Sequence, residues 1–104
     1  MKKILIFILL VLLSQPALAM NKNEIVKYFI SNQEPTAKDA LWSAPDVFKV
    51  GVIDNKSNRN GYAQYVCSVL AESGLSRGTW VQIMDIQKIV YQNKWVRLGE
   101  AHCR

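Results

Sequence analysis

Residues 60–74 have the sequence NGYAQYVCSVLAESG, and this segment decides the fold. Its apolar side chains recur at the i, i+4, i+7 and i+8 spacing that is typical of one face of an α-helix. Asn60 can cap the start of such a helix, and Gly74 can end it in the left-handed conformation. We therefore predict an amphipathic helix whose buried face consists of Tyr62, Val66, Val69 and Leu70.

Two apolar segments rich in β-branched residues flank this helix, at residues 47–53 and 80–86. A strand, a helix and a second strand in this order form a βαβ unit, in which the two strands lie parallel. A further strand is expected at residues 95–99. The sequence therefore predicts a small α+β domain, in which a three-stranded sheet (a βαβ unit plus a C-terminal hairpin) is covered by the central helix.

One or two short helices are expected before the sheet, at residues 21–32 and 37–43. Asn21 and Glu24 have the spacing of a capping box at the start of the first helix. Pro45 would end the second helix, because the residue before a proline is pushed out of the helical region.

Residues 87–93 have two interpretations. The alternation of apolar and polar residues up to Tyr91 favours a strand that continues to a hairpin turn at residues 92–94. The spacing of Ile86, Ile89 and Val90 favours a short helix instead. We prefer the hairpin.

The first 19 residues have the pattern of a bacterial signal peptide. Lys2 and Lys3 precede an unbroken apolar run at residues 4–13, and Ala17-Leu18-Ala19 is a small-x-small cleavage site. The apolar run is shorter than the about 20 residues that a membrane-spanning helix needs. We therefore expect cleavage after Ala19, a periplasmic or secreted product, and no stable membrane span after cleavage.

The remaining chain, residues 20–104, is expected to form one small α+β domain. The whole chain has 13 Lys and Arg against 8 Asp and Glu, a formal charge of +5, and removal of Lys2 and Lys3 leaves +3. Nucleic-acid binding would require a basic stripe with interleaved aromatic residues. Because the charges here are mixed and scattered, we expect no nucleic-acid partner.

Cys67 and Cys103 are the two cysteines of the chain. An even pair in an oxidising compartment predicts a structural disulfide. The alternative is a redox pair, although redox dithiols usually have the C-x-x-C spacing that these cysteines lack.

The polar loop at residues 54–61 lies between the first predicted strand and the central helix. A loop that leads into a helix N-terminus offers backbone N–H groups and a positive dipole end to an anion. No phosphate-binding motif accompanies it, so a purely solvated loop is the competing interpretation. The possible ligand-binding residues are Lys56, Asn58, Arg59, Asn60 and Gly61.

Neither a cofactor nor a metal is expected, because a Cys/His metal site needs three or four ligands and His102 is the sole histidine. No Ser-His-Asp or Cys-His arrangement is supported either, because no nucleophile-elbow motif surrounds a serine. Trp42, Trp80 and Trp95 could anchor an interface, but a domain of this size is expected to use its tryptophans mainly in the core.

These features favour a non-enzymatic, exported binding or accessory protein. Its partner would be another envelope or secreted protein, as for an inhibitor, an immunity factor or a secretion accessory. Two alternatives remain open: a small anionic-ligand binder that uses the loop at residues 54–61, and a thiol redox protein.

Overall fold

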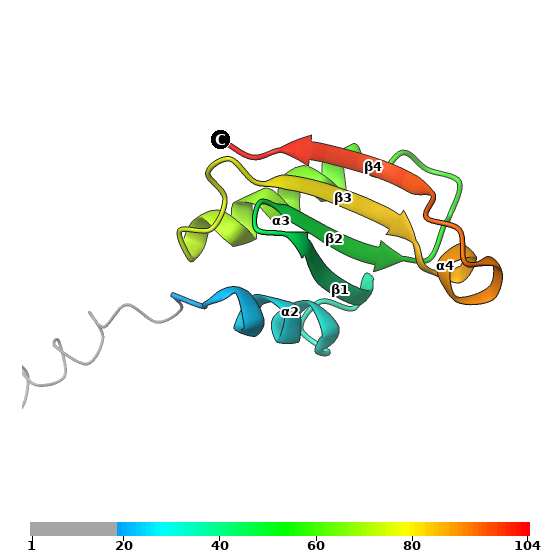
Figure 1. The fold of residues 1–104 in the computed structure, drawn as a ribbon, viewed down its shortest axis with the longest axis horizontal. Coiled ribbons are helices and arrows are strands. Elements are labelled where there is room, and N and C mark those ends of the chain that lie inside the picture. Colours follow the sequence, from blue (N-terminus) through cyan, green and yellow to red (C-terminus); the bar gives the residue numbers. More distant parts are fainter. Residues whose placement is uncertain (1–18) are drawn as a thin grey trace, which may run out of the picture.

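The computed structural model describes residues 19–104, and the predicted signal peptide therefore lies outside the described residues except for Ala19. The domain is α+β, as predicted, but its sheet has four strands rather than three (Figure 1). The elements are α2 (Lys22–Ile30), β1 (Ala37–Ala44), β2 (Val47–Val52), α3 (Asn60–Glu72), β3 (Trp80–Asp85), α4 (Ile86–Gln92) and β4 (Arg97–His102).

The strands are ordered β1-β2-β3-β4 across the sheet. β2 and β3 are parallel and are connected through α3, so the predicted βαβ unit is confirmed. β1 and β4 extend this unit on either side, each antiparallel to its neighbour. Among the described residues, no helix is long and apolar enough to cross a membrane.

The helix predicted at residues 37–43 is wrong, because this segment forms strand β1. Trp42 pairs with Phe48 of β2 in the sheet, and their ring centroids lie 4.7 Å apart. Pro45 and Asp46 form the turn between the two strands. Pairing with a central strand therefore overrides the helix propensity of this alanine- and lysine-containing segment.

The preferred hairpin at residues 87–93 is also wrong, and the alternative short helix is correct. Asp85 caps helix α4: its Oδ1 accepts hydrogen bonds from the backbone N–H groups of Gln87 (3.1 Å) and Lys88 (3.2 Å). Asn93 ends the helix in the left-handed conformation, with φ of 53°. The last strand consequently starts at Arg97, two residues later than expected.

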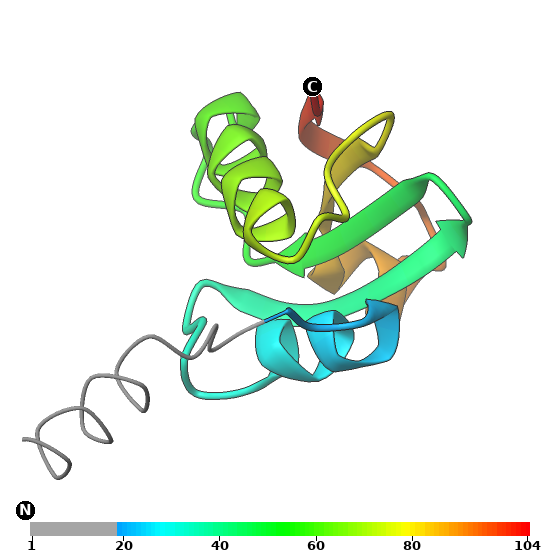
Figure 2. The same cartoon turned by 90° about the vertical axis from the view of Figure 1, so that its left-hand side faces the viewer.

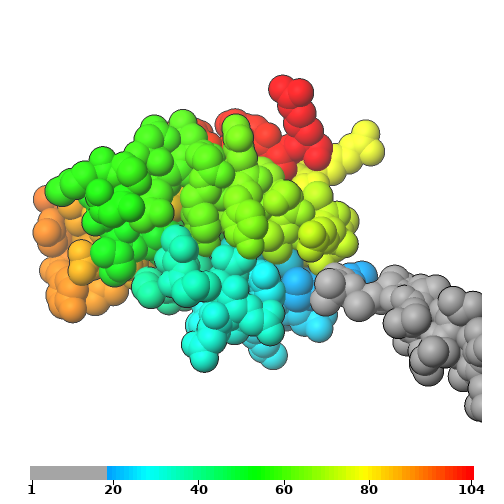
Figure 3. Space-filling model, turned by 180° about the vertical axis from the view of Figure 1, so that it is seen from behind, coloured from blue at the N-terminus to red at the C-terminus, as the bar shows by residue number. Residues whose placement is uncertain are grey.

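Helices α2 and α3 pack against one side of the sheet. The view from behind shows them over this side (Figure 3). Phe29 of α2 meets Phe48 of β2 with ring centroids 5.4 Å apart, and both side chains are fully buried. Burying a side chain of this size contributes about 1.5–3 kcal/mol relative to leaving it exposed. The predicted capping box of α2 is confirmed: Asn21 Oδ1 accepts from Glu24 N, and Glu24 Oε1 accepts from Asn21 N.

Candidate functional site

Within residues 19–104, no helix lies across the strands on the side of the sheet opposite α2 and α3 (Figure 2). We call this side the open face. Helix α4 and the segment after it reach only its end, beyond the carboxyl end of β3 (Figure 1). Strand register and the segment after α4 assign these residues to the open face: Asp39, Leu41, Lys49, Gly51, Trp80, Gln82, Met84, Trp95, Arg97, Glu100 and His102.

A small apolar hollow lies in the open face, where β1, β2 and β3 meet α4. Its volume is about 40 Å³. Gly51 shapes it, because a Cβ at this position would lie 2.9 Å from Ile86 Cδ1, so the glycine allows the α4 side chain to pack directly on β2. The lining residues are Asp39, Ala40, Leu41, Lys49, Gly51, Met84, Ile86, Ile89 and Trp95.

Two large apolar side chains at this hollow remain exposed. Trp95 is 51 % exposed and Leu41 is 38 % exposed. The expectation that the tryptophans lie mainly in the core is therefore wrong for Trp95, whereas Trp42 and Trp80 are half-buried. The reason is positional: Trp95 follows α4, at the end of the sheet that α2 and α3 do not cover.

Cations lie over both tryptophans of the open face. Lys49 Nζ is 4.9 Å from the ring centroid of Trp95, and the Arg97 guanidinium carbon is 5.4 Å from that of Trp80. Such cation–π contacts contribute about 0.5–1 kcal/mol each at exposed sites. These contacts favour the positions that both indole rings take on the surface.

The Trp80 cluster satisfies its own charges. The Trp80 indole Nε1 donates to Glu100 Oε1 (2.9 Å), and Glu100 Oε2 lies 3.6 Å from Arg97 Nη2. His102 stacks on Trp80 with ring centroids 5.2 Å apart. The charge of Lys49 is not balanced in this way. Within residues 19–104, its ammonium group lies over the Trp95 ring but makes no ion pair or hydrogen bond.

Both edges of the sheet are protected against pairing with another strand. β1 has register shifts on either side of its central pairs, and its exposed Lys38 and Asp39 carry charge. Beside β4, Arg59 N donates to Leu98 O (3.0 Å) and Glu100 N donates to Asn60 Oδ1 (2.9 Å). Irregular, charged or covered edges resist strand addition. The edges are therefore poor sites for strand addition, and the open face is the candidate contact surface.

Several of the loop residues predicted to bind an anion make hydrogen bonds within the protein instead. Asn58 Oδ1 accepts from Asn60 N (2.8 Å), and Arg59 Nη2 donates to Ile53 O (2.9 Å). Asn60 does not cap α3; Arg59 occupies the N-cap position without a side-chain cap bond. Lys56 and Gly61 are exposed. Anion binding at this loop stays a prediction.

Cys67 and Cys103 lie at disulfide distance, with an S–S separation of 2.01 Å and a Cα–Cα separation of 5.4 Å. The pair joins the middle of α3 to the segment after β4. This placement agrees with the predicted structural pairing and gives weak support to an oxidising compartment.

A buried carboxylate cluster was missed by sequence reasoning. Glu34, in the turn after α2, is 5 % exposed and accepts a hydrogen bond from the Tyr65 hydroxyl. That hydrogen bond is the main reason that the pKa of Tyr65 is raised. Burial, and then the negative charge of Glu34, raise the pKa of Tyr62. No local pattern distinguishes Glu34 in its polar linker, because the partners come from α3.

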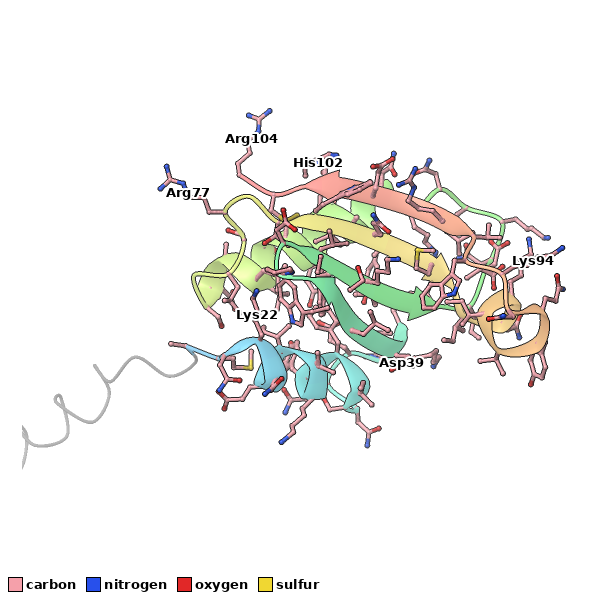
Figure 4. All side chains as sticks on the ribbon, in the orientation of Figure 1. Lys22, Asp39, Arg77, Lys94, His102 and Arg104 are labelled. Atoms are coloured by element: carbon pink, nitrogen blue, oxygen red, sulfur yellow. A yellow bond between two sulfur atoms is a disulfide. The ribbon has the colours of Figure 1, made fainter. Side chains whose placement is uncertain are left out.

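Basic side chains lie at both ends of the sheet (Figure 4). Arg77, His102 and Arg104 lie at one end, and Lys94 lies beside α4 at the other. Within residues 19–104, no group of three or more His, Cys, Asp or Glu residues is placed to hold a metal ion.

Comparisons with known proteins add no further assignment. No protein-family model, curated protein or solved structure significantly matches this chain.

Proposed function

We propose that this chain is an exported, non-enzymatic binding protein that docks onto another envelope or secreted protein through the open face. An inhibitor, an immunity factor and a secretion accessory all fit this description. The observation that carries the proposal is the helix-free face on which Trp95 and Leu41 remain exposed around an apolar hollow.

The residue types on this face support a protein partner. Tryptophan and arginine are enriched among the residues that dominate binding energy at protein interfaces. The open face carries two such tryptophans, and each indole ring has a cation over it: Lys49 over Trp95, and Arg97 over Trp80. Aromatic side chains that are already fixed lose little conformational freedom on binding, which favours affinity.

Site-specific photo-cross-linking in cells that express the full chain tests the proposal. A benzoylphenylalanine replaces Trp95 in one variant and Tyr91 in a matched control. Tyr91 is a good control because it is 81 % exposed on α4 but does not line the hollow. We expect a discrete adduct with a different protein from position 95, which a second substitution, Leu41→Asp, removes.

Adducts of equal yield from both positions, or no adduct from position 95, would contradict the proposal. An adduct with a second copy of this chain would also overturn it, because the open face would then be a self-association surface.

A further inference from the structure

We infer that the hollow in the open face is an anchor pocket. It takes one branched aliphatic side chain of the partner protein, and Lys49 binds a carboxylate next to that side chain. This inference rests on the proposed function, since it specifies the chemistry of the partner at the same surface.

The size and lining of the hollow select the side chain. A single water-sized sphere needs roughly 10–15 Å³ and a methyl group is larger, so a hollow of about 40 Å³ has room for about two methyl groups. The two terminal methyl groups of an isopropyl or isobutyl side chain have this size, whereas an aromatic ring is larger. The floor and walls are mainly apolar, and Met84 at the floor is almost fully buried.

The ammonium group of Lys49 determines which partner group lies next to the aliphatic side chain. Lys49 lies opposite Leu41 in the strand register, so its side chain belongs to the wall of the hollow. Arg97, the other strand cation on this face, is already paired with Glu100. Within the described residues Lys49 has no such pair. A partner carboxylate would supply the missing charge-assisted hydrogen bond.

Asp39 sets the direction in which the partner group lies. It is exposed on β1 (Figure 4) and lines the hollow opposite Gly51, whereas Lys49 pairs with Leu41 in the strand register. Its Oδ1 accepts from the N–H of Ala40 (2.8 Å), which holds the carboxylate in place. Because like charges repel, a partner carboxylate is favoured beside Lys49 and disfavoured beside Asp39.

Small probes test this chemistry without knowledge of the partner. The processed, exported protein is titrated with N-acetyl-L-leucine, with the neutral N-acetyl-L-leucinamide, and with N-acetylglycine, which has the carboxylate but no side chain. NMR shifts of the three indole N–H groups report the site. We expect saturable shifts centred on Trp95, with the acid of leucine binding about fivefold more tightly than its amide, as for a solvent-exposed ion pair.

Matched variants separate the two parts of the inference. Lys49→Gln should abolish the preference for the acid over the amide, whereas Lys27→Gln, an exposed lysine on α2, should leave it unchanged. Asp39→Asn should increase the preference. Two further probes distinguish the source of the carboxylate: a peptide that ends in leucine, and an amidated peptide in which glutamate follows leucine.

Equal affinity for the acid and the amide in the wild-type protein would overturn the inference. Shifts that are equal at Trp80 and Trp95 would overturn it as well, because the probes would then not select the hollow. These failures are distinct from failure of the proposed function, which is measured by the cross-link from position 95 and not by probe selectivity.

Discussion

Gly99 offers a sharp test of how the loop before α3 is held against the sheet. A Cβ at Gly99 would lie 2.2 Å from the carbonyl carbon of Arg59 and 2.5 Å from the backbone nitrogen of Asn60. Both contacts are with backbone, so no side-chain rotation can relieve them. Ordinary van der Waals contacts of a Cβ begin at 3.4 Å, whereas the contact with Arg59 would be 2.2 Å. The loop would therefore have to move away from β4 by more than 1 Å.

That movement would break the two hydrogen bonds that join the loop to β4. These bonds run from Arg59 N to Leu98 O and from Glu100 N to Asn60 Oδ1. Each contributes about 1 kcal/mol, and overpacking costs a further 1–3 kcal/mol, as an approximate range. We expect Gly99→Ala to lower the free energy of unfolding by about 3–5 kcal/mol, which is a large part of the stability of a small domain.

Urea denaturation of the purified protein, monitored by tryptophan fluorescence and circular dichroism, measures this loss. Gly61→Ala is the matched control, because Gly61 is the second residue of α3 and a Cβ there meets nothing within 4 Å. We expect the control to raise the free energy of unfolding by up to about 1 kcal/mol, since alanine has the higher helix propensity. A loss of less than about 1 kcal/mol in Gly99→Ala, or equal losses in both variants, would refute the reasoning.

Three further predictions concern stability. Reducing the Cys67–Cys103 pair, which closes a loop with a sequence separation of 36, should lower the free energy of unfolding in urea by about 4 kcal/mol; two free thiols in the mass of the purified, unreduced protein would contradict the disulfide. The folded-state pKa of Tyr62 is raised, so its contribution to the free energy of unfolding is complete below the unfolded pKa of about 10 and decreases as the pH rises above it, by up to roughly 1.4 kcal/mol per pH unit. Denaturation at several alkaline pH values should therefore show a shallower decrease of stability with pH in Tyr62→Phe than in the wild type. An identical slope of stability against pH would refute the assignment. Replacing Asn21 by alanine removes the cap of α2 and should cost about 1 kcal/mol; an unchanged urea midpoint would show that the cap contributes nothing.

The parts of the fold that follow from local pattern were predictable. The helical spacing at residues 60–74 and the two flanking apolar segments identify α3 and the parallel β2–β3 pair. The left-handed Gly74 just after α3 and the capping box of α2 are likewise local, and both are confirmed.

The errors arose where tertiary contacts or a single cap decide the structure. Residues 37–43 have helix-forming composition, and only pairing with β2 makes them a strand. At residues 86–92 the deciding group is the Asp85 carboxylate, whose hydrogen bonds start α4 and end β3.

The candidate site was only partly predictable, because it depends on which side of the sheet the helices cover. The cysteine pairing follows from the number of cysteines and the expected oxidising compartment, and its geometry agrees. The exposure of Trp95 could not be inferred, since it results from α4 placing this residue at the end of the open face. The position of Lys49 over the Trp95 ring could not be inferred either, because the two residues belong to segments that are distant in the sequence.

The most direct measurement is the dissociation constant of the protein captured from position 95, determined for the wild type, Trp95→Ala and Tyr91→Ala. The account predicts that Trp95→Ala weakens binding by at least about 30-fold, as for an interface residue worth 2 kcal/mol or more, and that Tyr91→Ala leaves the constant unchanged. Equal weakening by both substitutions, or no weakening by either, would contradict the claim that the open face is the binding surface.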